Sequence, residues 1–238
     1  MTKPKPNPKS DCISTLKRRI LSMEIAPGQL LDETSLSQEF GISRTPLREV
    51  IQRLVGEGYL SSQENRGAKV ASMDISTMRH FFQAAPMIYA SIARLAAEAA
   101  SGSQVDRLKS IQQAYRASIA EGQAQETAMH NYRFHQVIGE MAASPYLMPS
   151  LDRLLIDHTR IGQVFYQTKS PADRQRIDKA ADQHDQMVDA FARNAAAEAV
   201  QLTLEHWELS RHQMEQFVTP DPLPFELADE ARESRNAV

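Results

Sequence analysis

The sequence predicts a mainly α-helical protein with an N-terminal winged helix-turn-helix and a C-terminal all-α helical bundle. Three observations support this fold class. Apolar residues recur at helical spacing along most of the 238 residues. The first 70 residues follow the order helix, helix, turn, helix and short hairpin, which is typical of a winged helix-turn-helix. From residue 75 onward no strand pattern appears, and the segments have the periodicity of amphipathic helices.

The first elements follow from apolar spacing and turn residues. Residues 1–10 contain three lysines and three prolines, which predict a flexible basic arm. The spacing predicts a first helix over residues 13–21, which ends before a Pro-Gly turn. A second short helix should cover residues 33–40 and end at Gly41, because glycine readily adopts the left-handed conformation that closes a helix.

The third helix and the hairpin complete the N-terminal unit. Ser43 can cap a helix over residues 44–58, which has an apolar stripe and a proline in its first turn, where a missing N–H costs little. Two short segments, residues 59–63 and 68–72, are predicted to form the hairpin.

The remainder of the chain is predicted to be helical, with Gly, Ser-Pro or Asn at the breaks. The expected helices cover residues 75–101, 103–122, 125–143, 145–166, 171–193 and 195–217. The resulting division is a basic arm (1–10), a winged helix-turn-helix (11–73), a helical domain for effector binding and dimerisation (74–218) and a loose acidic tail (219–238).

Composition narrows the class of protein. The net charge of −3 argues against a protein that coats nucleic acid indiscriminately. Residues 1–70 contain 11 Lys/Arg against 8 Asp/Glu, and the rest contains 16 against 22, so one end is suited to phosphate. No apolar run reaches the roughly 18–20 residues of a membrane helix, and none follows the basic N-terminus as in a secretory signal. The single cysteine, Cys12, excludes an internal disulfide and fits a reducing cytoplasm.

The start of the third predicted helix has side chains that suit contacts with duplex DNA. Ser43 and Thr45 can donate hydrogen bonds to phosphate oxygens beside the positive end of the helix. Arg44 and Arg48 share one helix face, and arginine can bind guanine or phosphate through two parallel hydrogen bonds. The alternative is that both are ordinary solvated charges, but the preceding turn and the following hairpin favour DNA binding. The predicted DNA-binding residues are Ser43, Arg44, Thr45, Pro46, Arg48, Arg66 and Gly67.

Residues 16–71 resemble the DNA-binding domain of the GntR family of bacterial regulators. The resemblance implies a dimer bound to operator DNA. Many members have a basic residue where this chain has Thr34, so the second helix is expected to hold the DNA backbone less strongly. The matching landmarks are Pro27-Gly28, Leu36, Gly41, Ser43-Arg44-Thr45-Pro46, Leu47-Arg48-Glu49, Leu54, Gly58 and Arg66-Gly67.

Four polar residues of the predicted helical domain could converge on a metal ion. Asn131 and His135 are four residues apart and therefore share one helix face, whereas His184 and His206 lie on later helices. Imidazoles from separate helices can bind a transition metal in a bundle core. Spacing alone leaves open a chance pairing of Asn and His, since the chain contains seven histidines.

These four residues resemble the metal ligands of the FCD class of GntR regulators, a resemblance that covers residues 75–217. It implies an all-helical domain that binds a divalent metal (zinc, nickel or manganese) and a small organic acid between its helices. The class usually has Asp where this chain has Asn131. Three neutral imidazoles and an amide leave the metal charge uncompensated, so we expect substoichiometric metal and an anionic effector that completes the site.

The effector pocket is expected to differ from that of the class. Members often have an Arg and a Glu on the first helix of this domain, and neither charge occurs at residues 84–89 here. Tyr89 could line the pocket, and Arg153 and Arg160, seven apart on one face, could supply the missing cation. A core tyrosine and two surface charges are the alternatives. We expect His158 to face solvent.

Together these observations predict a transcription regulator, expected to be a repressor, whose affinity for a palindromic operator changes when an organic or sugar acid binds. One alternative is an architectural DNA-binding protein without an effector. Another is an enzyme that uses an open metal position to activate water. The absence of an H-E-x-x-H motif, a nucleophile elbow and a phosphate-binding loop argues against the enzyme.

Overall fold

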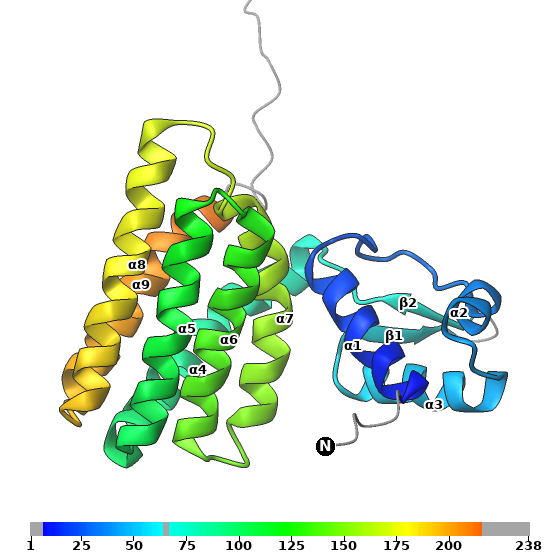
Figure 1. The fold of residues 1–238 in the computed structure, drawn as a ribbon, viewed down its shortest axis with the longest axis horizontal. Helices are drawn as coiled ribbons and strands as arrows, with labels where there is room; N and C mark the ends of the chain where they lie inside the picture. Colours follow the sequence, from blue (N-terminus) through cyan, green and yellow to red (C-terminus); the bar gives the residue numbers. More distant parts are fainter. Residues whose placement is uncertain (1–6, 64–66, 216–238) are drawn as a thin grey trace, which may run out of the picture.

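The computed structural model describes residues 7–63 and 67–215. Its N-terminal part contains three helices and a hairpin, and the predicted winged helix-turn-helix is confirmed (Figure 1). These elements are α1 (Pro8–Leu21), α2 (Glu33–Phe40), α3 (Arg44–Gly56), β1 (Leu60–Gln63) and β2 (Gly67–Val70).

Local capping explains where these helices begin and end. The side chain of Asn7 accepts hydrogen bonds from the N–H groups of residues 9 and 10, and Pro8 occupies the first helical position. Residues 8–10 are therefore helical, which corrects the predicted arm at those positions, and residues 1–6 lie outside the described part. Asp32 caps α2 through two backbone N–H groups, and Gly41 ends it with φ 61°, as predicted.

The hairpin is antiparallel, with Leu60 opposite Val70 and Gln63 opposite Gly67. Its inward side chains, Leu60 and Val70, are buried under the three helices. Residues 64–66, between the strands, lie outside the described part, so the predicted contact of Arg66 is not placed by the structure.

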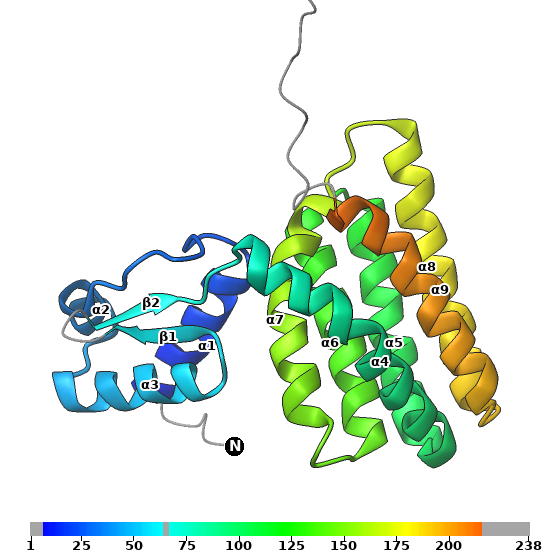
Figure 2. The same cartoon turned by 180° about the vertical axis from the view of Figure 1, so that it is seen from behind.

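The second part of the chain is a bundle of helices, as predicted. Figures 1 and 2 show α5 and α6 on one side of the bundle and α4 and α9 on the other. α4 continues through Pro86. None of the described helices is both long and apolar enough to cross a membrane. The helices are α4 (Ile75–Ala99), α5 (Gly102–Ala120), α6 (Ala124–Ala142), α7 (Met148–Phe165), α8 (Pro171–Ala192) and α9 (Ala196–Glu215).

The two parts have separate hydrophobic cores, and α7 contributes to both. Leu151 and Leu155 of α7 pack in the core of the bundle. Ile156, on the other side of the same helix, is fully buried among the apolar residues of α1, α3 and the hairpin. α7 therefore connects the N-terminal part to the interior of the bundle.

Candidate DNA-binding and metal-binding sites

The first turn of α3 presents its polar side chains to solvent. Ser43 is the N-cap residue, but its side chain makes no capping hydrogen bond. Ser43, Arg44, Thr45 and Arg48 are exposed, whereas Leu47 is fully buried and anchors the helix. No carboxylate of the described residues forms an ion pair with Arg44 or Arg48. Both guanidinium groups are therefore available to an external anion.

A hollow between α2 and α3 brings these arginines together. Arg44 and Arg48 line it with Thr34 and other polar residues of α2. Gly67, at the start of β2, has φ +80°, and a Cβ there would lie 3.1 Å from Glu33 Oε1. Glycine therefore lets the strand after the hairpin tip pass close to α2. Pro46 is half-buried in the first turn of α3, and its contact with DNA remains a prediction.

Three of the predicted metal ligands meet inside the bundle. His135 comes from α6, His184 from α8 and His206 from α9, and all three are buried. One nitrogen from each ring lies within 4.8 Å of the corresponding nitrogen of the others. Residues separated by up to 71 positions thus form one cluster, which we call the histidine cluster.

The hydrogen bonds of this cluster leave imidazole lone pairs in its centre. The amide of Gln112 donates to the carbonyl of Ala181 (2.8 Å), which directs Gln112 Oε1 toward His184 Nδ1 at 3.2 Å. His206 Nδ1 lies 3.1 Å from Gln183 Oε1. Because Gln112 is fixed in this way, His184 Nδ1 donates to it, and His184 Nε2 is an acceptor that lies 3.3 Å from His206 Nε2. A cation between them would stabilise this arrangement.

Two buried acceptor atoms of α6 are free to bind a metal ion. His135 Nε2 and Asn131 Oδ1 are buried, and no described residue gives either of them a hydrogen bond. A buried polar atom without a partner costs free energy unless an ion or ligand satisfies it. The three converging imidazole nitrogens suit a divalent transition metal, with Gln112 and Gln183 bound to the outer nitrogens of His184 and His206. Asn131 lies one turn before His135 on α6, and its amide oxygen remains the predicted fourth ligand.

Burial keeps these imidazoles neutral. The pKa values of His135 and His184 are lowered well below the usual value of 6.5, mainly because burial disfavours the charged ring. Burial and the neighbouring His158 lower the pKa of His206 to about 3. Neutral imidazole is the form that binds metal, so no proton competes at neutral pH.

His158 belongs to the same region, which corrects the prediction that it faces solvent. Its side chain is buried, its Nδ1 lies 2.6 Å from the hydroxyl of Tyr89, and its ring centroid is 5.5 Å from that of His135. The ring of Tyr89 lies 5.5 Å from that of His135. Tyr89 is thus a core residue beside the histidine cluster, and it is not among the residues that line the adjoining cavity.

The sequence contains a signal for the burial of His158. Leu151, Leu155, Gly162 and Phe165 form the buried stripe of α7 at spacings of four and three residues, and His158 occupies the missing position. Gln112 and Gln183 carry no comparable signal, because their role depends on the position of imidazoles from other helices.

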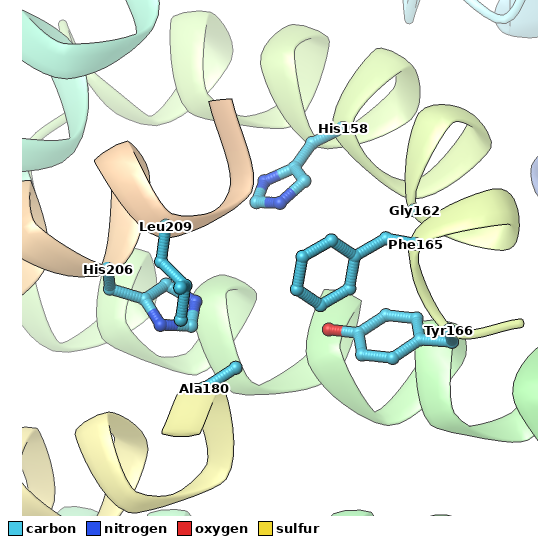
Figure 3. A pocket seen from close by; sticks show the side chains of 7 residues that line it. All are labelled: His158, Gly162, Phe165, Tyr166, Ala180, His206 and Leu209. Carbon is cyan, nitrogen blue, oxygen red and sulfur yellow. The ribbon is translucent and has the colours of Figure 1, made fainter. Parts of the chain in front are cut away.

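A small cavity adjoins the cluster (Figure 3). About 10 Å³ of it is available to the centre of a water molecule, which is room for about one water. In Figure 3 the rings of His158 and His206 and the hydroxyl of Tyr166 border the same space. A larger ligand therefore requires movement of these side chains. The cavity is lined by His158, Gly162, Phe165, Tyr166, Ala180, His206 and Leu209.

The two arginines expected in the pocket lie elsewhere. Arg160 is fully buried, donates to the carbonyl of Ala71 (2.7 Å) and forms an ion pair with Asp157. Arg153 donates to the other oxygen of Asp157 at 2.7 Å. Its Cδ lies 2.6 Å from where a Cβ on Gly58 would be. These arginines thus connect α7 to the N-terminal part, on the side of α7 away from His158, and neither lines the cavity.

Models of known protein families match both parts of the chain. The model described as bacterial regulatory proteins, gntR family, matches residues 9–70. The model of the FCD domain matches residues 81–209, which is more than half of the chain.

Individual proteins agree with this result. The HTH-type transcriptional repressor RspR of Escherichia coli (strain K12) is 26% identical over 166 residues, covering 68% of this chain and 73% of that protein. The fatty acid metabolism regulator protein of Haemophilus influenzae (strain PittEE) is 27% identical over 158 residues, 61% of this chain and 66% of that protein. The structure of E. coli McbR/YncC superposes with a TM-score of 0.75 at 17% identity, covering 90% of this chain and 100% of that one, so the fold is shared.

Proposed function

Because this chain belongs to the FCD class of the GntR transcription regulators, we propose that it is a repressor whose affinity for operator DNA is controlled by a small acid. Members of this family, including the relatives named above, regulate transcription and are not enzymes. The observation that carries the proposal is the exposed start of α3, where Arg44 and Arg48 have no carboxylate partner among the described residues. A dimer would place two such helices on a palindromic operator.

The DNA-binding part of the proposal is tested by first selecting the preferred duplex from a random pool with the full-length protein. Operator affinity is then measured by gel shift for Arg44→Ala, Arg48→Ala and a control, Arg94→Ala, in an exposed residue of α4. We expect the first two variants to lose specific binding and the control to retain it, with unchanged circular dichroism for all three. Normal operator protection by either α3 variant would contradict the assignment.

The histidine cluster is proposed to hold a divalent transition metal, which would supply a positive charge to an otherwise uncharged cavity. No Lys or Arg lines the cavity among the described residues. A carboxylate effector therefore has no fixed guanidinium to bind, and the metal is the cation available to it. We infer that an organic or sugar acid binds here only when metal is present, with Tyr89 and His158 positioned beside it.

The metal requirement is tested by thermal shift with a panel of organic and sugar acids. Each acid is measured in excess chelator and with added zinc, nickel or manganese. We expect the effector to raise the melting temperature only with metal, because a ligand stabilises the state it binds. Equal stabilisation in chelator would contradict the proposed role of the metal.

The contacts of α7 suggest how effector binding reaches the DNA-binding part. One side of α7 presents His158 to the cavity, and the other side binds the carbonyl of Ala71 through Arg160. Ala71 directly follows the hairpin. A ligand that displaces His158 would shift α7 and hence the position of the hairpin and α3. Effector binding and operator binding would thus favour different positions of one helix.

A further inference from the structure

A second concave site lies between α1 and the outer face of the bundle, away from the histidine cluster. We call it the basic cleft. Its volume is about 790 Å³, within the range of about 300–1,000 Å³ typical of sites for small molecules. Helices α5 and α6, on the near side of Figure 1, form one wall, and α1 forms the other. The cleft is lined by Ser14, Lys17, Arg18, Leu21, Tyr59, Arg107, Ser110, Ile111, Ala114, Met129, His130, Tyr132, Arg133 and Gln136.

The charged side chains that line the cleft are all basic. Among the described residues, the cleft is lined by Lys17, Arg18, Arg107 and Arg133, with His130, and by no Asp or Glu. Because no carboxylate faces into the cleft, an anion there would meet N–H donors and no direct negative charge.

Arg133 is the cation best placed to bind a ligand. Its side chain is exposed, and its Nη1 donates to Gln136 Oε1 at 2.8 Å. No carboxylate of the described residues pairs with it, whereas Lys17, Arg18 and Arg107 each have a Glu partner outside the lining. The remaining N–H groups of this guanidinium can hold a carboxylate through two parallel hydrogen bonds.

The floor and walls of the cleft are apolar and aromatic. Leu21 and Tyr59 are buried at its N-terminal side, and Ile111 and Met129 are half-buried on the bundle. The hydroxyl of Tyr132, on α6, lies 3.4 Å from that of Tyr59, in the N-terminal part. These two side chains therefore connect the two parts of the protein within the cleft. Such a surface suits a flat apolar body rather than a hydrated inorganic ion.

We propose that the basic cleft binds a small organic anion with an aromatic or other flat apolar body, whose carboxylate pairs with Arg133. This site is separate from the proposed effector pocket and needs no metal. Because α1 and α6 both line the cleft, the ligand contacts the DNA-binding part and the bundle at once. A ligand bound in the cleft fixes the distance between the DNA-binding part and the bundle. Operator affinity therefore responds to this second molecule as well as to the acid effector.

The test uses naphthoate as the probe and naphthalenemethanol as its neutral counterpart, titrated calorimetrically into the full-length protein in excess chelator. We expect one naphthoate per chain and binding of the alcohol weaker by about ten-fold, the effect of one charge-assisted pair. Arg133→Gln should weaken naphthoate by about the same factor, and Arg133→Lys by less. The matched control, Arg94→Gln on exposed α4, should bind like the wild type.

Equal affinity for naphthoate and the alcohol, or unchanged naphthoate affinity in Arg133→Gln, would overturn the proposal. Loss of binding in His206→Ala but not in Arg133→Gln would place the ligand in the histidine pocket and would also overturn it. Light scattering covers the remaining case. If the wild type binds no naphthoate, the proposal is overturned, and a change of oligomeric mass in Arg133→Gln would then show that the cleft is a contact between copies of this chain.

Discussion

Four buried imidazoles make the metal-free protein sensitive to acid. His135, His158, His184 and His206 are all buried, and each has a pKa below the usual 6.5 because burial disfavours the charged ring. The pKa of His158 is about 4 and that of His206 about 3. In the unfolded chain the same side chains titrate near their usual value. We therefore compare the free energy of unfolding of the metal-free protein at about pH 7.5 and at about pH 5.5, in excess chelator.

The direction and size of the effect follow from proton uptake. As the pH falls below 6.5, the unfolded chain binds a proton at each of these histidines and the folded chain does not. The stability that is fully present above pH 6.5 is therefore lost progressively as the pH falls toward the folded-state values. His158 and His206, whose folded-state pKa values are about 4 and about 3, each remove about 1.4 kcal/mol from the free energy of unfolding at about pH 5.5. The lowered pKa values of His135 and His184 act in the same direction.

The assay is urea unfolding followed by circular dichroism at both pH values. His158→Phe keeps a ring of similar size but cannot bind a proton, so the difference between the two pH values should shrink by about 1.4 kcal/mol. The lost hydrogen bond to Tyr89 lowers stability at both pH values and cancels from this difference. Gln83→Ala, in an exposed residue of α4 that carries no titratable group, should leave the difference unchanged. An equal pH dependence of the wild type and His158→Phe would refute the reasoning.

Three further outcomes are expected. The wild type should purify with substoichiometric metal and Asn131→Asp with more, because a carboxylate neutralises part of the metal charge; equal full loading by elemental analysis would contradict this. Asp157→Asn should lower the free energy of unfolding by about 3 kcal/mol, since it leaves the guanidinium of Arg160 buried without its counter-ion, whereas Asp178→Asn, in an exposed pair, should cost about 0.5 kcal/mol or less in the same urea titration. Operator affinity should fall steeply with salt concentration, because each phosphate contact releases counter-ions; a flat salt dependence in the gel shift would argue against phosphate binding.

The helices and the hairpin of this protein could be predicted from the sequence, because the signals that specify them are local. α2 has the predicted bounds, since Asp32 caps its first turn and Gly41 ends it in the left-handed conformation. The fold class and the family follow from the same kind of evidence. The order of helix, turn, helix and hairpin lies within 70 residues, and the amphipathic pattern of the bundle can be read one helix at a time.

Contacts between polar side chains of different helices depend on how the helices pack, and they became visible only in the tertiary structure. Gln112 and Gln183 could not be recognised as partners of the histidines, because their hydrogen bonds join residues on different helices. Arg160 could not be distinguished from a pocket cation until α7 packed with one side on the carbonyl of Ala71. Helical periodicity specifies which face of a helix is buried, whereas the element that covers this face depends on long-range packing.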